Sequence, residues 1–221
     1  VPELLANFNR GPFIQNTSTN STQVIWRTPV STDAVVEYGL TPALGLSCKV
    51  EAPTTEHALP LTNLAPGTKY YYRVRSTAAG QTAISPVTTF RTLKMSGDLT
   101  FVVFGDSGVG GLPQYQIAKG IRDAAPDLVL HVGDVIYPVF TTGYVDPRCL
   151  SVYRPHMTST PYFFVFGNHD LFSDPGSNGD KPFLEAFYLP TNTVTGTEHF
   201  YSFEHGDAHF TVLFIPYLSQ Y

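Results

Sequence analysis

The sequence has few charged residues, no basic excess and no long apolar run. Charged residues make up only 14% of the 221 residues, well below the roughly 25% of average soluble proteins. The formal net charge is −5 at pH 7, which argues against a protein that binds nucleic acid through a basic face. No apolar run approaches the roughly 18 residues that a membrane-spanning helix requires. The sequence therefore predicts neither a nucleic-acid partner nor a membrane span.

Cysteine pairs and a targeting segment are also missing. The only cysteines are Cys48 and Cys149, and neither belongs to a Cys-x-x-Cys pair. A disulfide between them is possible, but the pattern favours two unpaired thiols. The first ten residues, "VPELLANFNR", lack the basic start and apolar middle of a signal peptide. The sequence therefore either never had such a peptide or is a mature form.

The residues that are abundant suit a packed protein rich in strands. Hydrophobic residues make up 43% of the chain, which also contains 18 prolines, 18 glycines, 13 tyrosines and 16 phenylalanines. Aromatic residues favour strands, and proline and glycine favour turns. The length allows one large domain or two domains of ordinary size.

Residues 12–93 alternate between strand-like and turn-like segments. The strand-like segments are rich in β-branched and aromatic residues: "TQVIWRT" (22–28), "AVVEYG" (34–39), "KYYYRVRS" (69–76) and "VTTFRT" (87–92). The segments "TPVSTD", "GLTPALG" and "LAPGT" lie between them and are typical of turns. Strands at this spacing, without helical periodicity, predict a β-sandwich.

The segment "LTNLAPGTKYYYRV" (61–74) resembles the corner of a fibronectin type III domain. In that family a tyrosine two residues after a Pro-Gly-Thr turn bonds back to the backbone, and Tyr70 occupies this position. By the same resemblance, Trp26 is the large core residue of an early strand. The placement of Tyr70, Tyr72 and Val74 on one face also predicts a strand that is buried on one side only. The resemblance implies a fold and no activity.

From residue 99 the pattern becomes that of an α/β domain. Three apolar runs are typical of interior strands: "LTFVVFGD" (99–106), "DLVLHVGD" (127–134) and "PYFFVFGNHD" (161–170). Helical spacing of apolar residues between the first two runs predicts a parallel βαβ unit. The stretch between the last two runs contains three prolines and is predicted to be irregular. A short helix and two strands are expected after the third run.

Each of the three runs ends in glycine and a polar residue. Parallel strands direct their carboxyl ends toward one edge of the sheet, where ligands bind. We therefore expect four polar side chains to meet at this edge: Asp106, Asp134, Asn168 and His169. Glycine before each polar residue permits the sharp turn of the backbone.

Two carboxylates, an amide oxygen and an imidazole at one edge suggest a metal site. Carboxylates at close range repel each other unless a cation lies between them. Oxygen and nitrogen ligands suit divalent or trivalent metals rather than metals that prefer thiolates. A carboxylate that bridges two metal ions about 3.5–4 Å apart would suit phosphoryl transfer.

The motifs "GDSG" (105–108), "GDVIY" (133–137) and "GNHD" (167–170) resemble the signatures of the metallophosphoesterases. Tyr137 narrows the resemblance to the purple acid phosphatases, in which the tyrosine at this position binds a ferric ion. A fibronectin-like domain before the catalytic domain is also similar to these enzymes. The fold implied is an all-β fibronectin III-like sandwich, followed by the first half of an α/β metallophosphoesterase with a β-sandwich core and βαβ units.

The resemblance implies a role for each motif residue. Asp106 and Tyr137 would bind Fe(III), Asp134 would bridge both metals, and Asn168 would bind a divalent ion (Zn, Mn or Fe). His169 would steady the substrate phosphate or protonate the leaving oxygen. The reaction implied is hydrolysis of small phosphate monoesters at acid pH by a metal-bound hydroxide. The alternatives are a phosphodiesterase or nucleotide hydrolase on the same core, and a non-catalytic binding module.

The family pattern continues with a strand-ending histidine and a Gly-His-x-His element, and neither occurs in this sequence. We expect none of the later histidines to be a ligand, with His209 a core-strand residue, His205 a hairpin-turn residue and His199 unassigned. The catalytic domain is therefore expected to be incomplete at its C-terminus. A companion C-terminal polypeptide is one source for the remaining ligands.

Other polar side chains receive structural interpretations. His131 is expected in the core, and His57 and His156 at the surface or in loops. Arg154 could contact phosphate but is more typical of a solvated loop. Asp170 could orient the preceding histidine or cap a helix.

The predicted domains are residues 1–95 and 96–221. A secreted or extracytoplasmic location, and with it a glycoprotein, follows from the family resemblance and from two N-glycosylation sequons, at Asn16 and Asn20.

Overall fold

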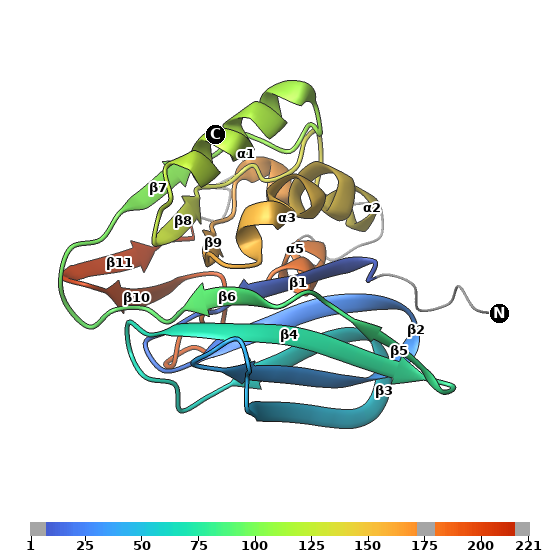
Figure 1. Cartoon of the computed structure of the whole chain (residues 1–221). Helices are drawn as coiled ribbons and strands as arrows, with labels where there is room; N and C mark the ends of the chain where they lie inside the picture. The colour runs from blue at the N-terminus through green and yellow to red at the C-terminus, as the bar shows by residue number, and fades with distance from the viewer. Residues whose placement is uncertain (1–7, 172–179, 215–221) are drawn as a thin grey trace, which may run out of the picture. The chain divides into compact units, whose positions relative to one another are not determined.

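The computed structural model describes residues 8–171 and 180–214. The chain divides into a first unit of residues 1–95 and 154–160 and a second unit of residues 96–153 and 161–221. Strands β1 to β6 belong to the first unit, and β7 to β11 belong to the second (Figure 1).

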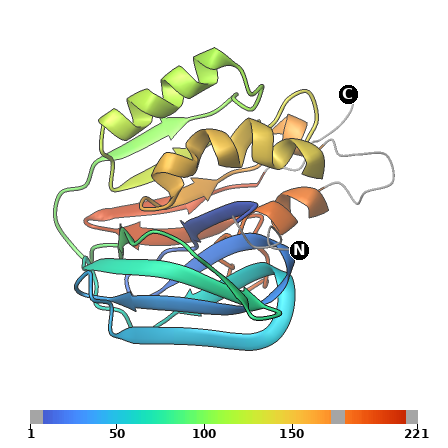
Figure 2. The same cartoon turned by 45° about the vertical axis from the view of Figure 1, so that its right-hand side comes forward.

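The strands of the first unit all pair antiparallel, as the sequence predicts. Its strands are β1 (Arg10–Gln15), β2 (Thr22–Gly39), β3 (Leu46–Leu61), β4 (Lys69–Ala78), β5 (Gln81–Ile84) and β6 (Thr88–Arg91). β2 pairs with β1, β3 and β4, while β5 and β6 both pair with β4. β2 and β3 form a long hairpin that pairs from Thr22 with Leu61 to Tyr38 with Leu46 (Figures 1 and 2).

One predicted turn in this unit is wrong. The segment "TPVSTD" (28–33) does not separate two strands but lies inside β2. The pairing of β2 with β3 shifts register between Arg27 and Ala34, so the strand bends there without ending. The first part of β2 then pairs with β1 and the last part with β4, as in a sandwich whose two layers share one bent strand.

Side chains along β4 and along parts of β2 are alternately buried and more exposed, and the buried ones form the core of the first unit. Trp26, Val36, Tyr72 and Val74 are among the buried residues that pack together. The hydroxyl of Tyr70 accepts a hydrogen bond from the backbone N–H of Ala65 at 2.9 Å. This bond confirms the predicted tyrosine corner.

His57 is a core residue, and the prediction that it lies at the surface or in a loop is wrong. Its side chain is 1% exposed, and its ring stacks on Trp26 with 4.7 Å between centroids. Its Nε2 lies 3.0 Å from the Thr28 hydroxyl and 3.1 Å from the Thr32 hydroxyl. Since β3 pairs His57 with Trp26, the burial follows from the neighbouring strand, which the local sequence does not reveal.

The second unit contains the predicted parallel βαβ arrangement. Strands β7 (Phe101–Phe104), β8 (Leu128–His131) and β9 (Tyr162–Phe164) form a parallel sheet in this order. Helix α1 (Leu112–Asp123) connects β7 to β8 and begins with proline in its first turn. Figures 1 and 2 show the three strands side by side with their ends at one edge.

The stretch after β8 is helical, although its prolines predict irregular structure. It contains α2 (Thr142–Val145), the π-helix η1 (Asp146–Leu150) and α3 (Ser151–Met157). Val145, Cys149 and Val152 are buried at helical spacing. Pro147 falls in the first turn of η1, where its missing N–H costs little, but Pro155 lies inside α3. The buried stripe therefore outweighs an unfavourable proline as well as a tolerated one.

The remaining elements are α4 (Asn168–Leu171), α5 (Lys181–Ala186) and an antiparallel hairpin of β10 (Tyr201–His205) and β11 (Ala208–Val212). The helix and the two strands predicted after the third run are therefore confirmed. Neither Cys48 nor Cys149 forms a disulfide in the structure. Across the described residues, no helix combines the length and apolar character that crossing a membrane would need.

Two further histidine predictions are wrong. His209 is exposed rather than in the core, and its Nδ1 lies 2.5 Å from Glu204 Oε1. Its side chain lies on the exposed face of β11. The alternation of apolar and polar residues in the sequence does not show which face of this strand is exposed. His156 lies buried inside α3 rather than on a surface loop. His205 ends β10 next to the hairpin turn, as predicted.

Candidate metal centre

The loops that follow β7 and β8 hold their aspartates in the same unusual backbone conformation. Asp106 and Asp134 both have a φ of 52°, in the left-handed region that few residues other than glycine, asparagine and aspartate enter. Two backbone hydrogen bonds join the loops, from Asp106 N to Gly133 O and from Ser107 N to Asp134 O, both 3.1 Å long. The strain is consistent with a functional position.

The loop after β9 packs directly against the backbone of the loop after β8. A Cβ added at Gly167 would lie 2.2 Å from both the backbone N and Oδ1 of Asp134. Only glycine therefore allows this approach, which brings the third motif to the second.

Tyr137 connects the two aspartates. Its hydroxyl lies 2.8 Å from Asp106 Oδ1 and 2.6 Å from Asp134 Oδ2. Burial, with hydrogen bonding and repulsion from both carboxylates, raises the pKa of the Tyr137 phenol. The phenol has one proton for two acceptors, so this group of oxygens has an excess of negative charge that a cation would neutralise.

His169 belongs to the same cluster, and Asn168 lies next to it in the chain. The backbone N–H of His169 donates to Asp134 Oδ1 at 2.9 Å, and the imidazole packs 4.5 Å from the Tyr137 ring. His169 Nδ1 lies 2.5 Å from Pro138 O, and since the carbonyl only accepts, Nδ1 carries a proton. Asn168 begins α4 with its side chain exposed.

Asp170 links the second and third loops through their backbones. Its buried carboxylate accepts hydrogen bonds from the N–H groups of Val135 and Gly167, each at 2.9 Å. Burial raises the pKa of Asp170 to about 7, although these hydrogen bonds act in the opposite direction. Asp170 lies inside α4, so its prediction as a helix N-cap is wrong.

His131 lies in the core beneath the loops, as predicted. It is fully buried, and its Nε2 lies 2.8 Å from the Ser107 hydroxyl. Burial lowers the pKa of His131 to about 3. The neutral ring therefore holds the loop of Asp106 in place through its contact with Ser107.

Gln114 and Arg148 contact the candidate site but were not identified from the sequence. Gln114 Oε1 accepts a bond from Gly110 N, and its Nε2 donates to Arg148 O, both at 2.7 Å. Arg148 Nη1 donates to the carbonyl of Tyr137. No local signal predicts these contacts, because Arg148 lies in the stretch whose prolines suggest irregular structure.

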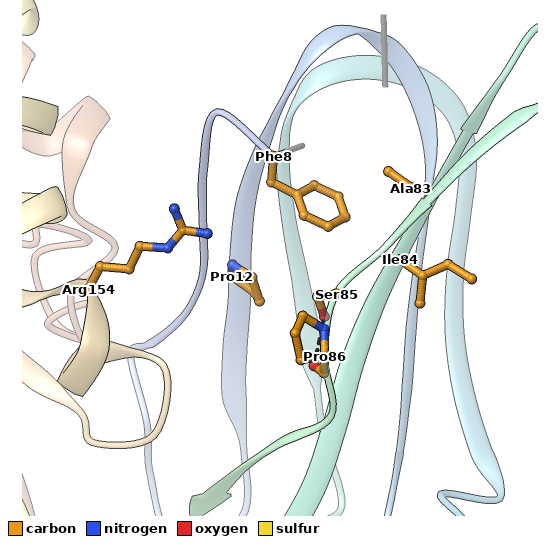
Figure 3. A pocket seen from close by; sticks show the side chains of 7 residues that line it. All are labelled: Phe8, Pro12, Ala83, Ile84, Ser85, Pro86 and Arg154. Atoms are coloured by element: carbon orange, nitrogen blue, oxygen red, sulfur yellow. Dashed lines mark hydrogen bonds between the residues drawn. The ribbon is translucent and has the colours of Figure 1, made fainter. Parts of the chain in front are cut away.

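Arg154, which could have met phosphate, lies in the first unit. Its Nη2 donates to Gly11 O at 2.8 Å. Figure 3 shows that it lines a cavity of about 210 Å³ with mainly apolar side chains, among them Phe8, Pro12, Ile84 and Pro86.

The three later histidines lie in different surroundings. His205 is buried, and His209 contacts Glu204. His199 contacts Asp180 through Nε2 and the Thr197 hydroxyl through Nδ1 at 2.5 Å. The prediction that none of them is a ligand stays a prediction.

The donor set fits hard metal ions, although it is small. Asp106, Asp134, Tyr137 and Asn168 offer only oxygen donors, which suit ferric and divalent ions rather than thiolate-preferring ones. Among residues 8–171 and 180–214, no three or more His, Cys, Asp or Glu side chains cluster closely enough to hold a metal by themselves. The Tyr137 phenol extends the pair of carboxylates to three oxygen donors, and Asn168, exposed at the start of α4, is the fourth candidate donor.

Comparison with known proteins matches both parts of the chain. Residues 11–92 match the family model for the purple acid phosphatase N-terminal domain, and residues 99–217 match that for the calcineurin-like phosphoesterases. Purple acid phosphatase 15 of Arabidopsis thaliana is 27% identical over 71% of this chain and 34% of its own. Acid phosphatase type 7 of Homo sapiens is 28% identical over 72% of this chain and 41% of its own.

A solved structure shares the fold. Purple acid phosphatase PPD1 from yellow lupin (Lupinus luteus) seeds has a TM-score of 0.70 and 21% identity, over 90% of this chain and 43% of its own. The two-part architecture predicted from the sequence is thus confirmed. The chain spans less than half the length of these relatives, between 34% and 43%.

Proposed function

Because the chain belongs to the calcineurin-like phosphoesterase family, and within it to the purple acid phosphatases, we propose that it forms the two-metal centre of a phosphate monoester hydrolase. One observation carries this proposal. The Tyr137 hydroxyl lies within 2.8 Å of Asp106 and 2.6 Å of Asp134, so three oxygen donors from two strand ends converge.

Each donor has a proposed role in this centre. Asp106 and Tyr137 would hold a ferric ion, Asp134 would be shared between this ion and a divalent ion (zinc, manganese or iron), and Asn168 would hold the divalent ion. Two metal ions here would lower the pKa of a bound water and neutralise the charge on the phosphate oxygens.

His169 acts on the substrate in this proposal. The bond from Nδ1 to Pro138 O fixes the tautomer and the ring orientation. In the doubly protonated ring Nε2 also carries a proton, with which it would steady the phosphate or protonate the leaving oxygen; the neutral ring that remains keeps its proton on Nδ1. The packing of the ring on Tyr137 keeps this nitrogen near the metal ligands.

The proposed substrates are small phosphate monoesters, hydrolysed at acid pH. A bound ferric ion would supply the low pKa of water that hydrolysis below neutral pH requires. The four donor side chains supply few ligands for two ions, and we propose that donors from another polypeptide segment complete the centre. The intact mass of the protein and of any polypeptide that copurifies with it tests this point.

Activity is tested with an aryl phosphate monoester, an aryl phosphate diester and a nucleotide. We expect hydrolysis of the monoester, loss of activity with a chelator, and a fall of at least about 100-fold in Asp134→Asn, the scale that loss of one essential electrostatic group produces. Asp123→Asn removes an exposed carboxylate of α1 and should leave the rate unchanged.

Other outcomes select the alternatives. Faster hydrolysis of the diester or the nucleotide would replace the monoesterase proposal with a phosphodiesterase or nucleotide hydrolase. A binding module would be favoured if none of the three substrates is hydrolysed, with or without added metal ions. The preparation for this test keeps every polypeptide that copurifies.

We also propose an extracytoplasmic location, with Asn20 as the glycosylated residue. Asn20 is exposed in the turn between β1 and β2, whereas Asn16 is half-buried with a φ of 47°. Peptide mass spectrometry of the native protein after enzymatic deglycosylation should detect conversion to aspartate at Asn20. Conversion at Asn16 alone, or at neither residue, would contradict the proposal.

A further inference from the structure

We propose that Arg148 is a positioning residue that holds Tyr137 in place for metal binding. This inference rests on the proposed function, because Tyr137 is a ligand only in that proposal. It concerns a side chain that lies outside the family motifs of the sequence and is 11 residues from Tyr137 in the chain.

The first step is a direct contact. Arg148 Nη1 donates to the backbone carbonyl of Tyr137, while the phenol of the same residue contacts Asp106 and Asp134. The backbone N–H of Tyr137 donates to Gly108 O at 3.2 Å. The residue is therefore fixed at its amide, its carbonyl and its hydroxyl, and Arg148 provides the charged contact at the carbonyl.

The guanidinium of Arg148 is itself held by an aromatic ring. Its central carbon lies 3.6 Å from the ring centroid of Tyr144, one helical turn earlier in the chain. A stacked cation–π contact restricts the plane of the guanidinium. Tyr144 thereby orients the donor that reaches Tyr137.

The backbone of Arg148 is connected to the loop that carries Asp106. Gln114, which is 5% exposed, donates through Nε2 to Arg148 O and accepts through Oε1 from Gly110 N. Gly110 lies four residues after Asp106. Arg148 thus connects the loop of one proposed iron ligand with the backbone of the other.

The local helix geometry gives independent support. Arg148 lies in the π-helix Asp146–Leu150, an element that is rare, appears mostly as single-turn insertions and is frequent at functional sites. The wider turn changes the direction of the side chains that follow it. Misplacement of an active-site group by about 1 Å can cost about 100-fold in rate, so a residue that fixes Tyr137 has a clear use.

The test uses the metal-free protein with tyrosine labelled by carbon-13 at Cζ. The Tyr137 signal is identified by its absence in Tyr137→Phe. We expect Arg148→Gln to shift or split this signal and Arg148→Lys to return it toward the wild-type position, because lysine also donates to a carbonyl. Arg122→Gln removes an exposed arginine of α1 and should leave every tyrosine signal in place.

A second variant covers the case in which Arg148→Gln does not fold. Tyr144 is 36% exposed, so Tyr144→Leu should fold, and we expect it to shift the Tyr137 signal through loss of the stacked contact. An unmoved Tyr137 signal in the folded variants would overturn the proposal. So would a shift in which all tyrosine signals move together, since that indicates a general structural role.

The same variants are then examined with iron bound. We expect Arg148→Gln to displace or weaken the visible tyrosinate–iron absorption, with partial recovery in Arg148→Lys. An unaltered absorption band would also overturn the positioning role. Wild-type protein without iron absorption would contradict the proposed function, and the metal-free spectra would still test Arg148.

Discussion

At the residue scale, the candidate site depends on three acidic groups that lie within hydrogen-bond distance of one another. Tyr137 shares one proton between Asp106 and Asp134, at 2.8 and 2.6 Å. Asp134 is only 8% exposed, so water does little to screen it. A centre of this kind is held together better with a cation than without one.

His57 gives a prediction at the same scale, for the first unit. Burial lowers its pKa to about 4, below the value of about 6.5 in an unfolded chain. The folded state therefore binds the proton less readily than the unfolded state, and stability present above about pH 6.5 is lost as the pH falls toward 4. The full loss is about 3 kcal/mol.

Urea unfolding at several pH values between 7 and 4 measures this effect. His57→Phe keeps a ring on Trp26 but does not titrate, so its stability should fall less over this range. His131 titrates in both proteins and cancels in the comparison. Parallel pH profiles for the wild type and His57→Phe would contradict the assignment.

At the scale of elements, the site depends on the close approach of strand ends. Gly167→Ala would place a methyl group 2.2 Å from the backbone N of Asp134. We expect a destabilisation of about 2 kcal/mol or more, since the neighbouring atoms are backbone and cannot move aside easily.

Gly120→Ala is the matched control for this substitution. Gly120 lies in α1 with open space around its Cβ position, so alanine there should stabilise by about 0.5–1 kcal/mol. Chemical denaturation of both variants checks the pair. Equal effects of the same sign would show that the loops after β8 and β9 do not pack as described.

Asp170 provides a second prediction for the same loops. Asp170→Ala leaves the buried N–H groups of Val135 and Gly167 without acceptors, which should cost about 2–3 kcal/mol of stability. Asp170→Asn keeps one oxygen acceptor and should cost less. Asp123→Ala, at an exposed ion pair, should change stability by no more than about 0.5 kcal/mol. An Asp170→Ala variant as stable as Asp123→Ala would contradict the bridging role.

The sequence predicts those elements whose signals are local. The sequence predicts Asp106, Asp134 and Asn168 as site residues because each directly follows an apolar strand segment and a glycine, a pattern contained in a few consecutive residues. The helices of residues 142–157 were not, because three prolines suggested irregular structure while the buried stripe was supplied by tertiary packing. His57 and Arg148 depend on partners distant in sequence, Trp26 and Tyr137, so their roles required the structure.

At the scale of the whole molecule, the chain consists of two segments that match different family models, one after the other. Residues 11–92 match the purple acid phosphatase N-terminal domain, and residues 99–217 match the calcineurin-like phosphoesterases. The exact domain boundary at residues 95 and 96 stays a prediction. The first unit supplies no residue to the proposed metal set, so the central claim concerns the second unit.

The most direct test of that claim is the metal content and visible spectrum of the purified protein, compared between wild type and Tyr137→Phe. We expect the wild type to bind iron with a second metal ion and to show the violet absorption of a tyrosinate–ferric pair. Tyr137→Phe should lose this absorption. Iron binding without the band, or a band that survives in Tyr137→Phe, would contradict Tyr137 as a ligand, and absence of bound metal would contradict the centre itself.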